Sequence, residues 1–115
     1  MDWLHLISYF LGGAFLTNAV PHFASGVMGA PFQTPFANPP GKGLSSSTVN
    51  VLWGFVNMVI GYLLTCRVGE FEWTATADVL ALGLGVLGMG LMHARIFGPL
   101  HGGLAPGRPG HPSDR

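Results

Sequence analysis

The residues best suited to chemistry are a few amides and imidazoles set in an otherwise apolar chain. They are Asn18, His22, Asn50, Asn57 and His93, with Arg95 close to the last of them. An imidazole can transfer a proton or bind a metal, and a carboxamide donates and accepts hydrogen bonds at once. Inside hydrocarbon such groups are costly, and each one there indicates a functional site by default. Whether these residues form such a site therefore depends on whether the segments that contain them lie in a membrane.

Composition indicates a membrane protein of one domain. The chain has 115 residues, and only 9% of them are Asp, Glu, Lys or Arg, against about 25% in soluble proteins. So few charges cannot make a water-facing surface. Net charge is zero with His neutral, and no basic patch exists that would bind nucleic acid. The one cysteine cannot form an intrachain disulfide.

Three apolar stretches predict an all-α integral membrane protein with three transmembrane helices. The spans are 3–20, 48–66 and 77–97, each about long enough to cross a bilayer. Pro21 should kink or end the first helix, although the apolar run lets it extend to residue 30. Residues 31–47 form a Pro/Gly-rich loop, and Ser46, Ser47 or Thr48 can cap the next span. We expect residues 1–97 to form the membrane domain and 98–115 a flexible Gly/Pro/His tail.

The middle span carries a narrow seam of small and amide side chains. Asn50, Gly54, Asn57 and Gly61 fall within an arc of about 60° on a helix. Asn57 lies near mid-membrane and needs a hydrogen-bond partner on another helix. This pattern predicts that the span 48–66 is the packing centre of the bundle.

The third span has small residues on two faces. It contains a G-x-G-x-x-G at residues 83–88, but a dinucleotide site would need a preceding strand, which is missing. One seam contains Ala81, Gly85, Gly88 and Met92, and the opposite face carries Gly83 and Gly90. Small residues on both faces predict close neighbours on two sides. Either this helix is wedged between the other two, or it also meets a second protomer, which we favour.

Topology gives an orientation. Three spans put the N-terminus and the loop after residue 66 on one side, with the first loop and the tail on the other. The second side carries Lys42, Arg95, Arg108 and Arg115, against Arg67 alone on the first. The positive-inside rule then places the C-terminus in the cytoplasm and the N-terminus outside, in a bacterial-type inner membrane or its equivalent.

The same topology brings the polar residues to one level. Asn18 and His22 end the first span where Asn50 starts the second and where His93 and Arg95 end the third, with Asn57 deeper. One hypothesis is a ligand-binding pocket, covered by the Pro-rich loop, in which His22 and His93 act as acid–base groups. The other is that these side chains bond one another and the backbone freed by Pro21, and so fix helix register. No carboxylate accompanies the histidines, so we predict no metal site.

Two functions follow from these hypotheses. The first is a small integral membrane protein that acts by helix–helix association, as a homo-oligomer or an accessory subunit of a membrane complex. The alternative is a membrane-embedded binder or enzyme for a lipid-like or quinone-like molecule. No span has an acidic residue at mid-membrane, which argues against a proton-coupled pump. The sequence names no cofactor and does not decide whether the protein is an enzyme.

Overall fold

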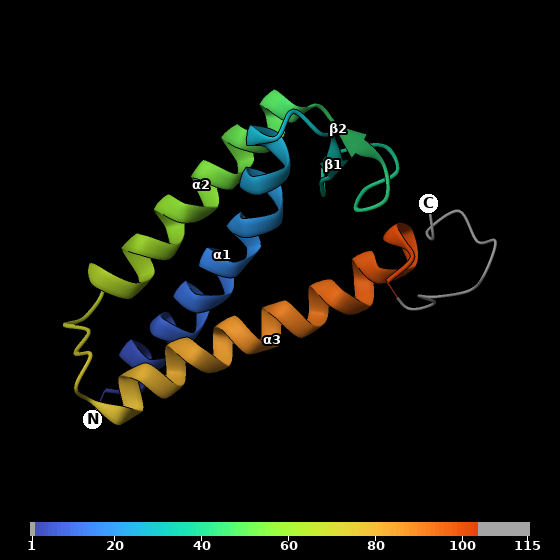
Figure 1. Ribbon diagram of the computed structural model, residues 1–115. Helices are drawn as coiled ribbons and strands as arrows, with labels where there is room; N and C mark the ends of the chain where they lie inside the picture. The colour runs from blue at the N-terminus through green and yellow to red at the C-terminus, as the bar shows by residue number, and fades with distance from the viewer. Residues whose placement is uncertain (1, 104–115) are drawn as a thin grey trace.

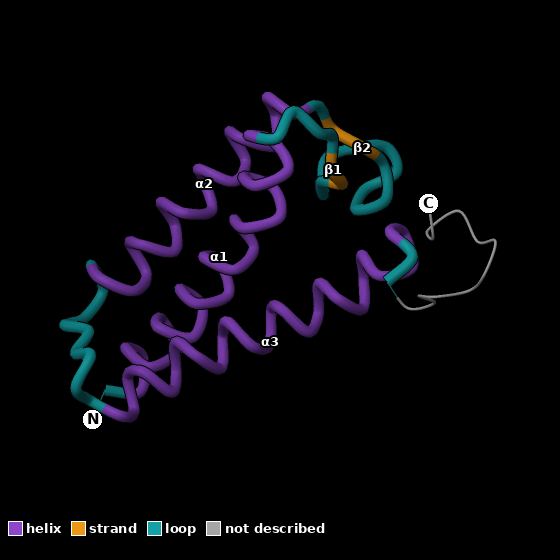
Figure 2. The backbone as a smooth tube through the Cα atoms, in the orientation of Figure 1, coloured by secondary structure: helices purple, strands orange, loops and turns teal. Residues whose placement is uncertain are grey.

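The computed structural model describes residues 2–103, and three long helices make up most of that part of the chain (Figures 1 and 2). Helix α1 spans Trp3–Val27, α2 spans Ser47–Cys66 and α3 spans Thr76–His101. Each is long and apolar enough to cross a membrane. The fold is thus all-helical in its main elements, as predicted. The predicted flexible tail lies, from residue 104 onward, outside the described residues.

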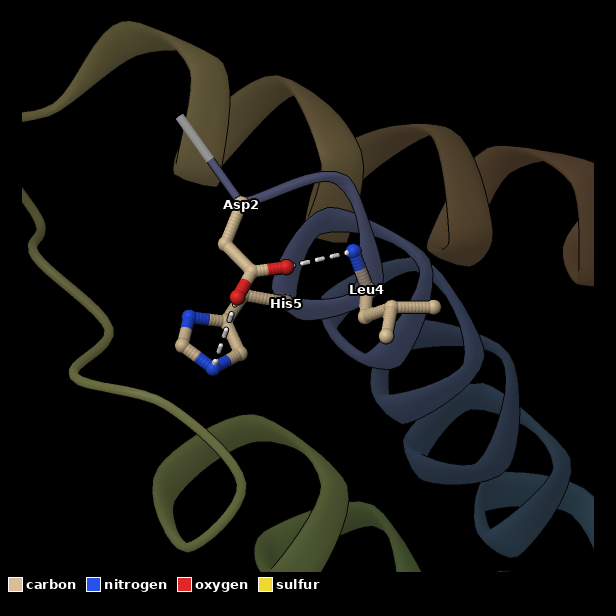
Figure 3. Close-up of polar contacts among 3 residues, drawn as sticks. All are labelled: Asp2, Leu4 and His5. Carbon is tan, nitrogen blue, oxygen red and sulfur yellow. Dashed lines mark hydrogen bonds and ion pairs between the residues drawn. The ribbon is translucent and has the colours of Figure 1, made fainter.

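Side-chain caps and turns define the helix ends. Asp2 Oδ1 accepts the Leu4 N–H at 2.9 Å at the start of α1, and Asp2 also lies 3.7 Å from His5 Nε2 (Figure 3). Ser46 Oγ accepts the Val49 N–H at 3.2 Å at the start of α2, as expected of this serine-rich segment. Helix α3 ends at His101, followed by Gly102 in the left-handed conformation that glycine adopts without strain.

Two prolines lie inside helices rather than at their ends. Helix α1 continues through Pro21 to Val27, so of the two predicted effects of this residue, ending the helix is wrong. Helix α3 similarly includes Pro99 and runs four residues past the expected end at residue 97. Transmembrane helices tolerate proline because neighbouring groups satisfy the backbone that it frees.

Helix α1, and not α2, is the packing centre. It contacts both α2 and α3, which lie on either side of it (Figure 1). The prediction that span 48–66 occupies the centre is therefore wrong. The reason is that α1 has close-approach glycines on two faces: a Cβ at Gly12 would collide with Thr65 of α2, and one at Gly13 with the Leu82 carbonyl of α3.

The α1–α3 pair is tight at one end and open at the other. Gly85 of α3 lies against the Phe10 carbonyl, so closely that a Cβ there would collide with it. Beyond this crossing the two helices diverge toward the C-terminal end of α3 (Figure 1). The space between the diverging ends is where the polar residues collect.

A small hairpin forms from the Pro-rich loop beside that open end (Figure 2). Strands β1, Phe32–Gln33, and β2, Leu44–Ser45, pair antiparallel with Phe32 opposite Ser45 and Gln33 opposite Leu44. Thr34 Oγ1 and Ser45 Oγ lie 2.6 Å apart and share a hydrogen bond. Gln33 and Thr34 are buried, so the loop is folded back against the bundle.

Burial is inverted relative to a soluble protein. The largest fully buried side chains among residues 2–103 are those of Tyr9, His22, Asn50, Asn57 and Thr34, and each carries an amide, imidazole or hydroxyl group. Large apolar side chains of all three helices face outward, among them Leu52, Phe55 and Leu84. Polar groups inside and apolar groups outside suit a hydrocarbon surrounding.

Candidate functional site

A chain of amide and imidazole groups joins the three helices. Asn57 Nδ2 of α2 donates to the Trp53 carbonyl at 2.8 Å, and Asn57 Oδ1 accepts from Asn18 Nδ2 of α1 at 2.8 Å. Asn18 Oδ1 in turn lies 2.8 Å from His93 Nε2 of α3. Asn57 thus has the partner on another helix that its depth requires, and Asn18 connects all three helices.

The direction of this chain is fixed at its carbonyl end. A backbone carbonyl can only accept, so Asn57 Nδ2 must donate to it, and Asn57 Oδ1 is left to accept from Asn18. Asn18 then presents its oxygen to His93, and His93 Nε2 must carry the proton. In the neutral imidazole the other nitrogen, Nδ1, is therefore an acceptor, and it has no hydrogen-bond partner among the described residues.

A second hub lies where α2 begins. The Asn50 carboxamide, fully buried, directs Nδ2 at the carbonyls of Phe32, Ser45 and Ser46, at 3.2, 3.1 and 3.0 Å. Its Oδ1 lies 2.8 Å from His22 Nδ1 of α1. One amide thereby ties both strands of the hairpin to α1 and α2.

The same argument fixes the tautomer of His22. Three carbonyls hold the donor side of Asn50, so its oxygen must accept and His22 Nδ1 must carry the proton. His22 Nε2 is then an acceptor in the neutral ring, with no hydrogen-bond partner in residues 2–103. The ring is held edge-on against Phe32 and Trp53, with centroids 5.3 and 6.4 Å apart.

A cavity of about 350 Å³ lies between α1, α3 and the hairpin. Its polar lining comes from Asn18, His22, Gln33, Thr34 and His93. The rest is apolar, with Phe15 from α1 and two methionines, Ile96 and Phe97 from α3. Within residues 2–103, no Asp, Glu, Lys or Arg lines it. This volume is in the range of small-molecule sites, and an apolar wall with a few polar groups is typical of them.

A second hollow, of about 560 Å³, lies on the other side of the α1–α3 gap. It is lined by Thr17, Val20 and Pro21 of α1 and by the end of α3. His93 and Phe97 line both spaces and so form the partition between them. Phe97 packs edge-on against Phe32 of the hairpin at 4.9 Å and against His93 at 5.2 Å.

The end of α3 is fastened to the hairpin. His101 Nε2 donates to Gln33 Oε1 at 2.8 Å, and the His101 ring lies 5.2 Å from that of Phe32. These contacts link the C-terminal end of α3 to the hairpin across the open end of the α1–α3 gap. We call the His101–Gln33 pair the clasp.

The sequence hypothesis assembled most of this cluster. The structure brings these five residues into two hydrogen-bonded groups: Asn57, Asn18 and His93 form one, and His22 with Asn50 forms the other. Within residues 2–103, no hydrogen bond joins the two groups; Asn18, His22 and His93 line the same cavity. Arg95 does not join them: it is exposed and does not line the cavity. Residues 93 and 95 are about 200° apart on a helix, which puts Arg95 on the opposite face.

Sequence reasoning missed the contribution of the hairpin. Gln33, Thr34 and Ser45 were not selected as site residues, and neither was His101. The one available signal was the pair Phe32 and Phe36 among the prolines of residues 31–47, which fits either a loop on the membrane surface or a loop folded back over the bundle. The backbone carbonyls that hold Asn50 have no sequence signal at all.

The predicted packing residues divide into two groups. Gly54, Gly61 and Gly85 lie against α1, where an added Cβ would crowd Phe23, Leu16 and Phe10 respectively. Ala81 is half-buried. Gly83, Gly88 and Gly90 face open space, with nothing of the described chain within 4 Å of an added Cβ. Because α3 diverges from α1, Gly88 does not continue the seam that Gly85 begins.

Other polar groups are simpler. Asp78 Oδ2 accepts the Glu72 N–H at 3.0 Å at the start of α3, which is an end-of-helix contact. Cys66 is exposed at the end of α2. No group of three His, Cys, Asp or Glu in residues 2–103 could hold a metal ion. Comparison with protein-family models, curated proteins and solved structures finds no match to this chain.

Proposed function

We propose that this protein is a membrane-embedded binder of a lipid-like or quinone-like amphiphile, with the polar head of the ligand at His22 and His93. The observation that carries the proposal is the cavity of about 350 Å³, in which both imidazoles, with Asn18, Gln33 and Thr34, face a wall that is otherwise apolar. A network that served only to fix helix register would need no such space beside it, because interiors otherwise pack closely. The second hollow beyond His93 and Phe97 gives an apolar tail a place beside the lipid.

The two imidazoles are also the candidates for any chemistry. Each has one nitrogen committed to an asparagine and one without a partner among the described residues. A positioned imidazole with a free nitrogen can accept or return a proton. Should the bound molecule be transformed, His22 and His93 are the acid–base groups that we expect to do it.

The test is whether a molecule stays with the purified protein and depends on these histidines. The protein is extracted in mild detergent, and bound small molecules are identified by native mass spectrometry and solvent extraction. His22→Ala and His93→Ala should each lose the molecule, whereas His5→Ala, at the far end of α1, should retain it. If both site variants keep a bound amphiphile at full occupancy, or wild type never holds one, the proposal is wrong.

A second function is favoured by the exposure of α3. Only 6% of its most apolar stretch is buried, against 33% in α1 and 28% in α2. Helix α3 is not wedged between the others, so its outward glycines have no neighbour within the described chain. We propose that these glycines let α3 meet another helix closely, in a homo-oligomer or as an accessory subunit.

This second function is tested by the assembly state. Gly88→Leu should dissociate an oligomer seen by native mass spectrometry, while Leu84→Ala, also outward on α3, should not. A wild-type protein that is monomeric at all concentrations in lipid nanodiscs, and that copurifies with no other membrane protein, contradicts it.

We further propose that the hairpin end faces the cytoplasm of a bacterial-type cell and the N-terminus lies outside. Lys42 and Arg95 are at the hairpin end and Arg67 at the other. The native Cys66 is exposed at the outer end, so a membrane-impermeant maleimide should label it in intact cells. A Cys66→Ser, Lys42→Cys variant should be labelled only after lysis. If the cysteine at position 42 is labelled in intact cells and Cys66 only after lysis, the orientation is the opposite of the one proposed.

A further inference from the structure

Resting on the proposed binding function, we propose that the head group this cavity takes is uncharged and carries hydroxyl groups, which donate to His22 and His93. The candidates are therefore neutral glycerolipids and hydroquinones. Anionic lipids and fully oxidised quinones are disfavoured. The direction of the hydrogen bonds at the cavity wall leads to this assignment.

Each neutral imidazole must donate its one N–H to an asparagine oxygen of the protein. The chain from His93 through Asn18 and Asn57 ends on the Trp53 carbonyl, and the chain from His22 through Asn50 ends on three carbonyls. Since no carbonyl can donate, neither chain can reverse. The neutral rings therefore offer only lone pairs, at His22 Nε2 and His93 Nδ1.

Charge restricts the ligand further. A carboxylate or phosphate head would need Lys or Arg beside it in so apolar a site, because an unpaired buried charge is strongly unfavourable. The lining has neither residue type within residues 2–103, and Arg95 and Lys42 are exposed and do not line the cavity. The absence of a lining carboxylate from the same residues likewise leaves nothing to stabilise a doubly protonated imidazole.

A ligand that can only accept hydrogen bonds cannot pair with these imidazole lone pairs. Quinone carbonyls or ether oxygens facing an imidazole lone pair leave two acceptors unpaired, which costs about as much as a lost hydrogen bond. An O–H group in the same place supplies the missing proton. The structure therefore assigns the site to donors, with one hydroxyl for each histidine.

Two matched ligand pairs test this assignment. The first is 1-oleoylglycerol against its dimethyl ether, which replaces each O–H by O–CH₃ on the same chain. The second is decyl hydroquinone against decyl quinone, which replaces O–H by C=O. Oleate and oleoyl lysophosphatidate provide anionic heads. Dissociation constants are measured on the full chain in lipid nanodiscs at about pH 8, where an ordinary imidazole is neutral.

We expect each hydroxyl ligand to bind about ten- to a hundredfold tighter than its partner, because the two ligands of a pair differ in two hydrogen bonds and each good bond is worth up to about tenfold. The pair with the greater absolute affinity identifies the source as glycerolipid or hydroquinone. Equal or reversed affinities within both pairs, or tightest binding by an anionic head, overturn this inference while leaving the binding function intact. If no member of the panel binds, the proposed function itself is overturned, and the inference with it.

A variant checks that the histidines cause the preference. His93→Phe keeps an aromatic ring in the partition but has no lone pair, so the hydroxyl preference should shrink severalfold while apolar tail binding persists. Phe15→Leu, which alters only the apolar lining, should change the affinity of both members of a pair equally. A preference that survives His93→Phe and His22→Phe together contradicts the assignment.

Discussion

Asn18 of α1 and Asn57 of α2 are joined by a 2.8 Å hydrogen bond inside the bundle, and the remaining atoms of both carboxamides are also paired. Replacing either residue by alanine leaves the carboxamide of the other without its hydrogen-bond partner. We expect Asn18→Ala and Asn57→Ala each to lower the free energy of unfolding by about 1–2 kcal/mol, with a coupling energy of about 0.6–1.7 kcal/mol in the double-mutant cycle. Steric-trap unfolding in bicelles measures these free energies. If the effects of the two substitutions are additive, the hydrogen bond between the two residues contributes no measurable stability.

Gly85 and Gly83 offer a matched pair on one helix. A Cβ at Gly85 would collide with the Phe10 carbonyl, while Gly83 has nothing of the described chain within 4 Å. Gly85→Ala should therefore cost about 1–3 kcal/mol by forcing α1 and α3 apart. Gly83→Ala should be neutral or stabilise by up to about 1 kcal/mol, because alanine is the better helix former. Thermal unfolding in detergent compares the two, and shifts of the same sign and size would contradict the packing described.

The clasp between His101 and Gln33 should control the open end of α3. Because the pair is only partly buried, His101→Ala should change the free energy of unfolding by less than about 1 kcal/mol. It should nevertheless broaden the distance distribution between spin labels at Lys42 and Arg95, in a chain lacking Cys66. His5→Ala is the control at the opposite end. An unchanged distribution would mean that other contacts hold α3 in place.

Phe97 should control how fast a ligand enters from the lipid. It separates the cavity from the outer hollow and packs against Phe32 and His93. Phe97→Ala removes two aromatic contacts of about 0.5–1.5 kcal/mol each. We expect ligand association and dissociation both to quicken by about tenfold with little change in Kd, as measured by stopped-flow exchange in nanodiscs. A large loss of affinity with an unchanged association rate would mean that Phe97 acts as a binding contact and not as a gate.

The three long apolar helices were predictable because they depend on composition alone. A stretch of apolar residues without charge identifies a helix that can cross hydrocarbon, and antiparallel topology then puts His22, Asn50 and His93 at one level. The need of Asn57 for a partner on another helix followed from its depth. None of these steps requires knowing which faces of the helices touch.

The errors arose where rotation and divergence of helices decide the outcome. Helix α1 took the centre because Gly12 and Gly13, adjacent in sequence, face different neighbours, whereas the seam in span 48–66 faces only one. Gly88 was expected to extend the contact of Gly85, but the helices separate beyond that crossing. The divergence of α1 and α3 therefore explains both why the packing prediction for Gly88 was wrong and why the site has its volume.

The central position of α1 has a consequence for how the chain is made. This helix is synthesised before the other two, yet the partners of Asn18 and His22 belong to α2 and α3. The hairpin that holds Asn50 also follows α1 in the chain. Until those segments emerge from the ribosome, its amide and imidazole must find temporary partners in water, in the translocon or in an insertase. For insertion into a membrane as proposed above, we therefore expect α1 and α2 to be delivered together as a helical hairpin, with α3 docking afterwards.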